Sequence, residues 1–442
     1  MKSALARLAA LSSYESTGSF SSRQYTMDAM RALLAHMDNP QAKFKSIHVA
    51  GTNGKGSVCH MIHSIFSAAG YKTGLYTSPH LERINERIVI NGNAIPDGVL
   101  ETLASELFRV IDATGAHPSY FDALTIIAFL YFSREGVDVA VVETGLGGRL
   151  DSTNVVGPCA AIITDISIDH MAVLGPTLAD IAREKAGIIK HGGLVISSNG
   201  AGPAREVIER AARDSSARLA LLGVDFHARR VEDSAYDFLR FDYESHLHSM
   251  RGIDVRAHGF FQAANASLAV KCSLQAAGFG LPIPETSIRK GLAGLDIPGR
   301  MALLSRAPLI LFDPAHNPAA MDALLHTIAR RNPNRRIIAI ASFMKDKDYA
   351  AMLETLAAFS DALYVLELDD PRGMKRSDPR VRKAVRGARE LHEPGSAGEL
   401  CASLASRPLE GDLLLFTGSF RLFGIAKEIS LKLSKSGSSM DA

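Results

Sequence analysis

Cysteine is scarce in this sequence, and neither sign of charge dominates. The 442 residues include four cysteines, far apart and without the paired spacing of a metal site, which excludes a disulfide scaffold and suits reduced thiols in a cytoplasmic enzyme. The 49 Lys and Arg against 47 Asp and Glu leave a formal charge of +2, and no basic block marks a surface for nucleic acid or an anionic membrane. We therefore expect no nucleic-acid partner, and any anion must be bound locally.

Long hydrophobic runs are also missing. The longest, residues 123–132, is roughly half of what a bilayer-spanning helix needs, so we expect no membrane association. With 47% hydrophobic residues, 36 Gly and 18 Pro, the composition is globular and excludes collagen-like, disordered and coiled-coil chains. Because single cores stop growing near roughly 250–300 residues, the length predicts two domains. We expect a soluble, monomeric, cytoplasmic protein.

Alternation of strand-like and helix-like segments predicts an α/β protein. Residues 46–50 are a short β-rich run that ends in a glycine-rich turn, and the apolar positions from Val58 to Ala69 then follow the spacing of one helix face. Such strand, loop and helix units form parallel sheets with helices on both faces. The other predicted strands are 137–142 and 160–164 in the first part of the chain, and 309–312, 337–341, 362–366 and 413–416 in the second.

Three segments differ from this pattern. Methionine and leucine spacing after Tyr25 predicts a packing helix that includes Met27 to Met37. Partial alternation of polar and apolar residues within 218–256 predicts antiparallel strands, as an insertion or an extension of the sheet, to which we assign no function. The turn-rich stretch 291–299 predicts a linker, so that the first domain ends there.

A glycine-rich loop between a predicted strand and a predicted helix carries the strongest chemical signal. In Gly51-Thr-Asn-Gly-Lys-Gly-Ser57, backbone N–H groups and the helix N-terminus can surround a phosphate, and Lys55 can reach its terminal oxygens. The loop is tighter than the usual Walker A pattern, since Val49 stands where the first Gly belongs and Gly56 separates the lysine from the hydroxyl residue. The lysine, Ser57 and the strand-loop-helix setting favour nucleotide binding over a simple glycine turn.

Glu143 closes the apolar strand 137–142. A carboxylate at the carboxyl end of a parallel strand faces the ligand crevice and can hold Mg²⁺, although a strand-terminal Glu alone is more often a solvated loop residue. The loop that follows at once has Arg149, Asp151 and Asn154 among its glycines, which allow a ligand close to the backbone. This context favours a functional role.

Other polar clusters are ambiguous on their own. Asp165 and Asp169-His170 follow the next strand, but a lone His is usually a capping or core residue, and imidazole is a less common Mg²⁺ ligand than oxygen. Lys185 would by default be a surface helix lysine. Asp313-Pro-Ala-His-Asn-Pro318 has the residues of a helix cap, which does not exclude a catalytic role.

Together these motifs resemble the folylpolyglutamate synthase/dihydrofolate synthase family, within the Mur ligase group of ATP-dependent amide-forming enzymes. The resemblance covers roughly residues 20–425 and is most similar to the bifunctional bacterial members. It implies a P-loop, parallel-sheet ATP-binding and substrate domain over 1–295, then a smaller Rossmann-like α/β glutamate-ligase domain over 300–442. The motifs are GTNGKGS at 51–57, YTSPHL at 76–81, NERI at 85–88, ETGLGGRLDSTN at 143–154, DH at 169–170, EKAGI at 184–188, PGR at 298–300, DPAHNP at 313–318 and TGS at 417–419.

The resemblance also implies a role for individual residues. Two departures affect these expectations, since Pro314 replaces the Gly, Ser or Val of many relatives and Asp122 replaces a common Glu. The implied ATP ligands are Thr52, Asn53, Gly54, Lys55, Gly56, Ser57, Asn265, Arg300 and Asp313; the implied Mg²⁺ ligands are Ser78, Glu143 and His170, with Lys185 as a carbamate at a second metal ion; the implied pterin site is Ser119, Tyr120, Phe121, Leu150, Asp151 and Ser152; and the implied catalytic set is Lys55, Glu143, His170, Lys185 and His316.

The implied reaction adds L-glutamate to dihydropteroate, to a reduced folate, or to both, through an acyl phosphate, with release of ADP and phosphate. The segments 119–121 and 150–152, with His80, favour both activities, while folylpolyglutamate synthesis alone stays open. A Mur-type cell-wall peptide ligase shares the ATP chemistry but not the GKGS and YTSPHL details. A P-loop switch or motor would turn over ATP without regard to glutamate, and a nucleotide-binding module would not turn it over.

Overall fold

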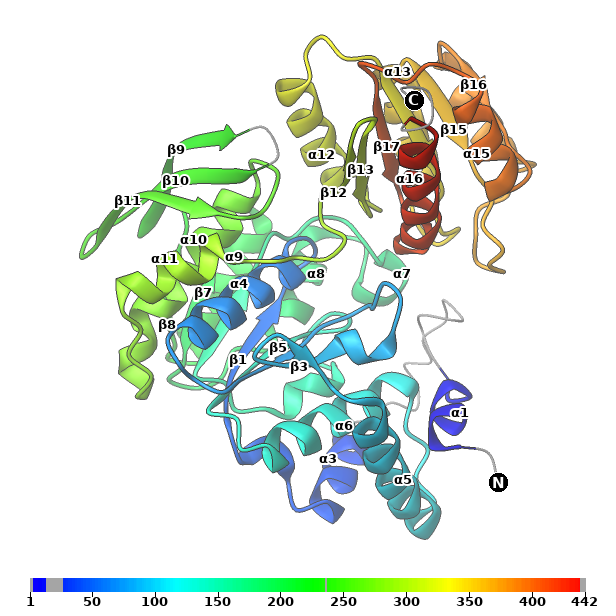
Figure 1. The fold of residues 1–442 in the computed structure, drawn as a ribbon. Helices are drawn as coiled ribbons and strands as arrows, with labels where there is room; N and C mark the ends of the chain where they lie inside the picture. Colours follow the sequence, from blue (N-terminus) through cyan, green and yellow to red (C-terminus); the bar gives the residue numbers. More distant parts are fainter. Residues whose placement is uncertain (1–2, 13–26, 235–236, 438–442) are drawn as a thin grey trace. The chain divides into compact units, whose positions relative to one another are not determined.

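The computed structural model describes residues 3–12, 27–234 and 237–437 (Figure 1). The chain divides into two compact units. The first unit comprises Met1–Glu232, Phe238–Arg256 and Phe261–Asp296, and the second comprises Asp233–Asp237, Ala257–Phe260 and Ile297–Ala442.

The first unit is built on an eight-stranded sheet with the order β4-β3-β2-β5-β1-β6-β7-β8. The six strands from β2 to β8 in this order run parallel, and β3 and β4 add an antiparallel edge. This confirms the predicted parallel α/β sheet. The strands are β1 Lys45–Ala50, β2 Thr73–Tyr76, β3 Ile88–Ile90, β4 Asn93–Ala94, β5 Val139–Glu143, β6 Ala160–Ile163, β7 Leu194–Ser197 and β8 Arg218–Leu221.

Helices cover both faces of this sheet. On one face, α5 and α6 pack on Tyr76, Ala140 and Val142, and α8 and α9 pack on the neighbouring strands. On the other face, α4 contacts β1, β2 and β5 and is covered in turn by α10 and α11. The helices are α1 Ala4–Ala9, α3 Met27–His36, α4 Lys55–Ala68, α5 Asp97–Thr114, α6 Tyr120–Arg134, α7 Met171–Leu174, α8 Leu178–Ala186, α9 Pro203–Asp214, α10 Gln262–Gln275 and α11 Glu285–Ala293.

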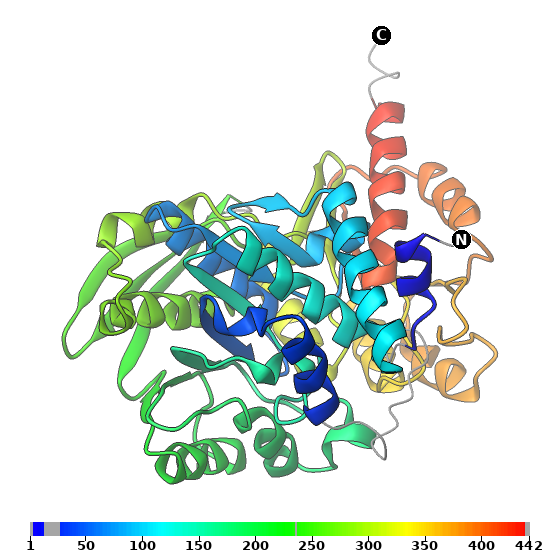
Figure 2. The same cartoon turned by 90° about the horizontal axis from the view of Figure 1, so that it is seen from below.

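The N-terminal segments pack on this unit. In both views α1 lies beside α5 (Figures 1 and 2), and Arg7 pairs with Asp112 at 2.6 Å. The helix predicted after Tyr25 is α3; Tyr25 itself lies outside the described residues. No helix among the described residues is both long enough and apolar enough to cross a bilayer.

Two of the predicted boundaries need correction. Residues 218–221 form β8 and pair in parallel with β7, so the antiparallel strands begin only at Phe226; they form a separate sheet of β9 Phe226–Ser234, β10 Phe238–Ser245 and β11 Ser249–Val255. Gly291 is not a turn residue, because it lies in the last turn of α11. A Cβ atom there would lie 2.5 Å from the Ile65 Cα, so this glycine allows α11 to approach α4.

The second unit has a six-stranded sheet with the order β12-β13-β17-β14-β15-β16, in which β12 is the antiparallel edge strand. All four strands predicted in this part of the chain are present. The elements are β12 Ala302–Arg306, β13 Leu309–Asp313, α12 Pro318–Arg331, β14 Ile337–Ala341, α13 Tyr349–Phe359, β15 Ala362–Val365, α14 Pro379–Ala384, β16 Leu391–His392, α15 Ala397–Ala405, β17 Leu413–Thr417 and α16 Phe423–Gly437.

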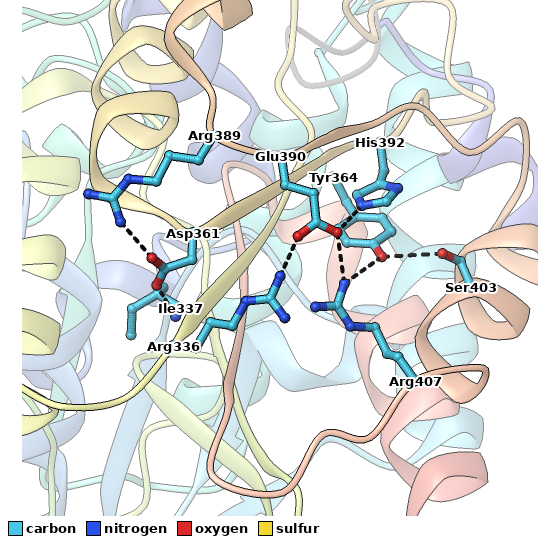
Figure 3. Close-up of polar contacts among 9 residues, drawn as sticks. All are labelled: Arg336, Ile337, Asp361, Tyr364, Arg389, Glu390, His392, Ser403 and Arg407. Atoms are coloured by element: carbon cyan, nitrogen blue, oxygen red, sulfur yellow. Dashed lines mark hydrogen bonds and ion pairs between the residues drawn. The ribbon is translucent and has the colours of Figure 1, made fainter.

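A network of charged residues holds the β16 edge of this sheet (Figure 3). One oxygen of Glu390 is 2.7 Å from His392 Nε2 and accepts from Arg407 at 3.1 Å, while the other accepts from Arg336. The His392 ring stacks on Tyr364 with the ring centroids 4.2 Å apart. Glu390 is therefore the shared acceptor of three basic side chains.

Replacing Glu390 with Gln should lower the melting temperature by about 2–4 °C at low ionic strength, since a surface network of this kind contributes about 1 kcal/mol. Hydrogen bonding to His392 and the nearby arginines lower the Glu390 pKa. Its contribution is thus present above the unfolded carboxyl pKa and is lost as pH falls through the lower folded value. Glu393→Gln removes an exposed carboxylate three residues away and is the control. An equal shift in both variants would contradict the assignment.

Candidate active site

The site of the first unit lies where four neighbouring parallel strands end. The strands β2, β5, β1 and β6 lie side by side in this order, so their carboxyl ends share one edge of the sheet. Ser78 follows β2, Glu143 ends β5, the loop 51–57 follows β1, and Asp165 and His170 follow β6. The fold thus brings together residues that are far apart in the sequence.

The carbonyl oxygen of Gly51 is a common acceptor for two lysines. Lys55 Nζ donates to it at 3.1 Å and Lys185 Nζ at 2.7 Å. Lys185 is only 4% exposed, so it is not the surface lysine expected by default. Gly51 has a φ of +153°, and a Cβ atom there would lie 1.7 Å from the Thr164 Oγ1, so only glycine fits.

The rest of the loop is held by the segment that follows β6, and it approaches α10 closely. Thr52 N donates to the Asp165 carbonyl at 2.7 Å, and Asn53 Nδ2 donates to Ser167 Oγ at 2.9 Å. Gly54, the N-cap of α4 with a φ of +88°, leaves no room for a Cβ, which would lie 2.5 Å from Asn265 Oδ1. Lys55, Gly56 and Ser57 form the first turn of α4, so their backbone N–H groups point out of the helix N-terminus.

The predicted Mg²⁺ ligands offer a suitable donor set. Glu143 is 3% exposed, and its carboxylate accepts from the Ser78 backbone N–H at 3.1 Å. His170 has a φ of +50°, a costly conformation for a non-glycine residue that often marks a functional position. The buried carboxylate of Glu143 and the hydroxyl of Ser78 are the oxygen ligands that a hard divalent cation prefers, while the imidazole of His170 is a less common ligand for Mg²⁺. No cluster of three or more His, Cys, Asp or Glu side chains that could hold a metal occurs in the described ranges.

The pKa of Asp165 depends on its burial and on two neighbouring side chains. Burial raises the pKa of Asp165, while Asn53 and Lys185 oppose that shift. The bond from Lys185 Nζ to Gly51 needs one N–H, which both an amine and a carbamate possess. Carbamylation of Lys185 stays a prediction.

The two segments expected to bind a pterin meet at Asp122. One Asp122 oxygen accepts from the Ser119 N–H at 2.8 Å, and the other accepts from Ser152 Oγ at 2.5 Å. Asp122, which stands where many relatives have Glu, thus takes part in the N-terminal cap of α6 and connects this helix to the loop 150–152. Asp151 is buried, accepts from the Leu146 N–H at 2.8 Å and has a pKa raised by that burial.

Arg149 and Asn154, in the glycine-rich loop 145–154, are paired with other side chains of the protein. Arg149 pairs with Glu184 on α8 at 2.9 Å. The side-chain oxygen of Asn154 accepts from Lys190 at 2.7 Å. Both contacts fasten the loop to α8 and the segment after it, so these side chains are engaged in holding the loop.

In the second unit, Arg300 and His316 lie near the Phe420 ring, and Asp313 lies within the electrostatic reach of Arg300. Asp313 is 8% exposed and accepts from the Met301 and Ala315 N–H groups, each at 2.9 Å; burial raises its pKa, and Arg300 opposes that shift. Arg300 lies 4.8 Å above the Phe420 ring, and the His316 ring is 6.2 Å from it. His316 Nδ1 is 2.8 Å from the Pro314 carbonyl, which can only accept.

Sequence reasoning missed several of these residues. Gln262 donates to Ser57 at 3.3 Å and accepts from Asn265 at 2.8 Å, so it links α10 to the loop. Its position three residues before Asn265 on one helix face was the available signal. Ser167 and Phe420 gave no signal, because their partners are distant in the sequence.

Comparison with known proteins decides the family. Residues 49–273 match the Mur ligase middle domain, and residues 299–420 match the Mur ligase glutamate ligase domain. The chain is 34% identical over 367 residues to a Lacticaseibacillus casei folylpolyglutamate synthase (82% of this chain, 83% of the relative). It is 33% identical over 396 residues to the Bacillus subtilis dihydrofolate synthase/folylpolyglutamate synthase (88% and 91%). The chain belongs to the folylpolyglutamate synthase/dihydrofolate synthase family.

A solved structure agrees with this membership. The Mycobacterium tuberculosis folylpolyglutamate synthase complexed with ADP and AMPPCP superimposes with a TM-score of 0.83 at 30% identity, covering 92% of this chain and 95% of that one. The predicted family, the fold and the class of ATP-dependent amide-forming ligase are confirmed. Membership in this ligase family argues against a P-loop switch or motor and against a simple binding module.

Proposed function

We propose that this ligase of the folylpolyglutamate synthase/dihydrofolate synthase family joins L-glutamate to dihydropteroate and to reduced folates through an acyl phosphate. The observation that carries the proposal is the shared sheet edge of the first unit, where the phosphate loop follows β1 and buried Glu143 ends β5. The loop after β5 is bonded to the start of α6 through Ser152 and Asp122. The four unpaired cysteines suit a cytoplasmic location.

The first step transfers the terminal phosphoryl group of ATP. A carboxylate is a poor electrophile, so an oxygen of the acceptor carboxylate attacks the γ-phosphorus and ADP leaves. The N–H groups of residues 52–57 surround the phosphates, and Lys55 turns from the Gly51 and Thr52 carbonyls toward the transferring group. Gln262 holds the loop from α10 through its bond to Ser57, and Asn265 donates to Gln262.

Ser78, Glu143 and His170 would hold Mg²⁺, and a carbamate on Lys185 would contribute to a second ion. Bound there, Mg²⁺ supplies charge neutralisation for the phosphate oxygens. Glu143 is prepared for this role because its carboxylate is buried and oriented by the Ser78 N–H. The acceptor lies against Ser119, Tyr120 and Phe121, with Leu150, Asp151 and Ser152 on the facing segment.

The second step uses groups that we assign to the second unit. The amine of glutamate attacks the acyl carbon, phosphate leaves, and the amine gives up a proton. Because His316 Nδ1 donates to the Pro314 carbonyl, the neutral ring carries a lone pair on Nε2, which suits acceptance of that proton. Arg300 shares the Phe420 ring with His316, and Asp313 interacts electrostatically with Arg300.

Purified enzyme with Mg-ATP and glutamate, offered dihydropteroate and a reduced folate separately, tests the proposal. We expect an amide product and an equal amount of ADP with each acceptor. Extension of the folate alone would limit the activity to folylpolyglutamate synthesis. Product from a cell-wall nucleotide peptide and from neither pterin compound would instead support the alternative of a Mur-type cell-wall ligase.

A further inference from the structure

Asn199, the second residue after β7, is a buried amide that has no role in the reaction described above. It is 5% exposed, and both polar atoms of its carboxamide have partners. Its Oδ1 accepts from the Ile166 N–H at 3.0 Å, and its Nδ2 donates to the Thr164 carbonyl at 2.8 Å. The same Nδ2 donates to Ser197 Oγ at 3.0 Å. Asn199 therefore ties the segment that follows β6 to the end of β7.

The peptide unit between Asp165 and Ile166 is held from two sides. This peptide is trans, so its carbonyl and its N–H point in opposite directions. The N–H donates to Asn199. The carbonyl accepts from the Thr52 N–H at 2.7 Å and from the Asn53 N–H at 3.3 Å. Asn199 and the start of the phosphate loop thus hold the same peptide from opposite directions.

The order of the strands explains this arrangement. Because β6 lies between β1 and β7, the segment after β6 has the phosphate loop on one side and the residues after β7 on the other. The segment makes further bonds to the loop, since Thr52 Oγ1 donates to the Ser167 carbonyl at 3.1 Å and accepts from the Ser167 N–H at 3.2 Å. A displacement of residues 164–167 would therefore move the start of the phosphate loop.

We propose that Asn199 is a positioning residue for nucleotide binding, because its carboxamide fixes the peptide that in turn fixes the start of the phosphate loop. A hydrogen bond to the N–H of this peptide also polarises its carbonyl, which strengthens the bonds that the carbonyl accepts from the loop. A loop that is already fixed loses less conformational freedom when it binds a ligand, so it binds more tightly. This inference rests on the proposed function, since the nucleotide is the ATP named there.

Asn199→Leu tests the inference, because leucine has nearly the same shape and removes the hydrogen bonds of the carboxamide. The KM for ATP and the dissociation constant of ADP should rise about tenfold, since buried backbone groups beside the loop lose their partner. The KM values for the acceptor and for glutamate should stay within about twofold of the wild type. In full-length enzyme, hydrogen–deuterium exchange should become faster in the peptides that contain Thr52 and Ile166.

Ser197→Ala is a milder change to the same contact. It removes the hydroxyl that holds the Asn199 carboxamide and leaves the bonds to Thr164 and Ile166 in place. The KM for ATP should therefore rise in the same direction as in Asn199→Leu, but by a smaller factor.

Asn332→Leu is the matched control. Asn332 is 7% exposed, and its carboxamide also donates to a backbone carbonyl, that of Ile328 at 3.2 Å. It belongs to the second unit, and its replacement breaks no bond of the segment 164–167. The melting temperature should fall in both Asn→Leu variants, whereas the KM for ATP should rise in Asn199→Leu and not in the control.

Two results would overturn the inference: an unchanged ATP KM and unchanged exchange at Thr52 in a destabilised Asn199→Leu, or an equal rise of the KM values for all three substrates. If Asn199→Leu fails to fold, Ser197→Ala decides by the same readouts. Failure of the proposed function is distinct, because wild-type enzyme would then ligate neither acceptor while ADP binding and exchange still reported on Asn199.

Discussion

Lys55→Met should lower the rate of ligation by about 10²–10³-fold or more, because a positioned cation at the transferring phosphoryl group is lost. The substitution removes the bonds from Lys55 Nζ to the Gly51 and Thr52 carbonyls, both of which lie in the same loop. Methionine keeps most of the side-chain volume, so the fold should persist. The measurement is ADP and amide product at saturating substrates, together with the melting temperature.

Lys43→Met is the matched control for this variant. Lys43 is exposed and pairs with Asp38 at 2.5 Å, so its replacement removes the same charge from the same unit without touching the phosphate loop. Ligation by the control should equal that of the wild type. Substantial turnover by Lys55→Met would remove the lysine from the proposed mechanism.

Gly51→Ala should abolish nucleotide binding and lower the stability of the first unit. The added Cβ would lie 1.7 Å from the Thr164 Oγ1 and 3.2 Å from the Thr164 Cα, so β1 and β6 would have to separate. That displacement would move the Gly51 carbonyl, to which Lys55 and Lys185 both donate. Titration with ADP and thermal unfolding measure the two effects.

Gly70→Ala separates steric overlap from backbone strain. Gly70 also has a positive φ, of +92°, but a Cβ atom there meets nothing within 4 Å. Gly70→Ala should lower the free energy of unfolding by about 1–2 kcal/mol, which is the cost of a left-handed backbone conformation at a non-glycine residue. It should leave nucleotide binding intact. If Gly51→Ala behaved like Gly70→Ala, steric overlap with Thr164 would not be the reason for a glycine in the loop.

The sequence was most informative where chemistry and periodicity coincide. The strand before Gly51 and the helix after it were predictable because a buried β-rich run and a helix face flank a loop of unusual composition. The carboxyl ends of β2, β5, β1 and β6 then had to share an edge, since parallel strands align their ends. Individual ligands such as Ser78 came from family resemblance, and their roles stay predictions.

What could not be predicted depends on close approach between distant residues. Gly291 begins a stretch whose composition is typical of a turn. Only the short distance to Ile65 on α4 shows why the helix needs a glycine there. The contact of Arg300 with Phe420 joins residues far apart in the chain. The burial of Arg87 contradicts the usual exposure of arginine, so no local pattern could indicate it.

The bridging carboxylate of Asp122 has a consequence for how this enzyme can diverge. Each of its two oxygens accepts from a different segment that we propose to bind the acceptor, one through Ser119 and one through Ser152. A substitution that reshapes one segment is therefore transmitted mechanically to the other. Natural drift or laboratory selection toward a new acceptor should accumulate changes in compensating pairs across this bridge, and libraries that randomise only one side should recover few active variants.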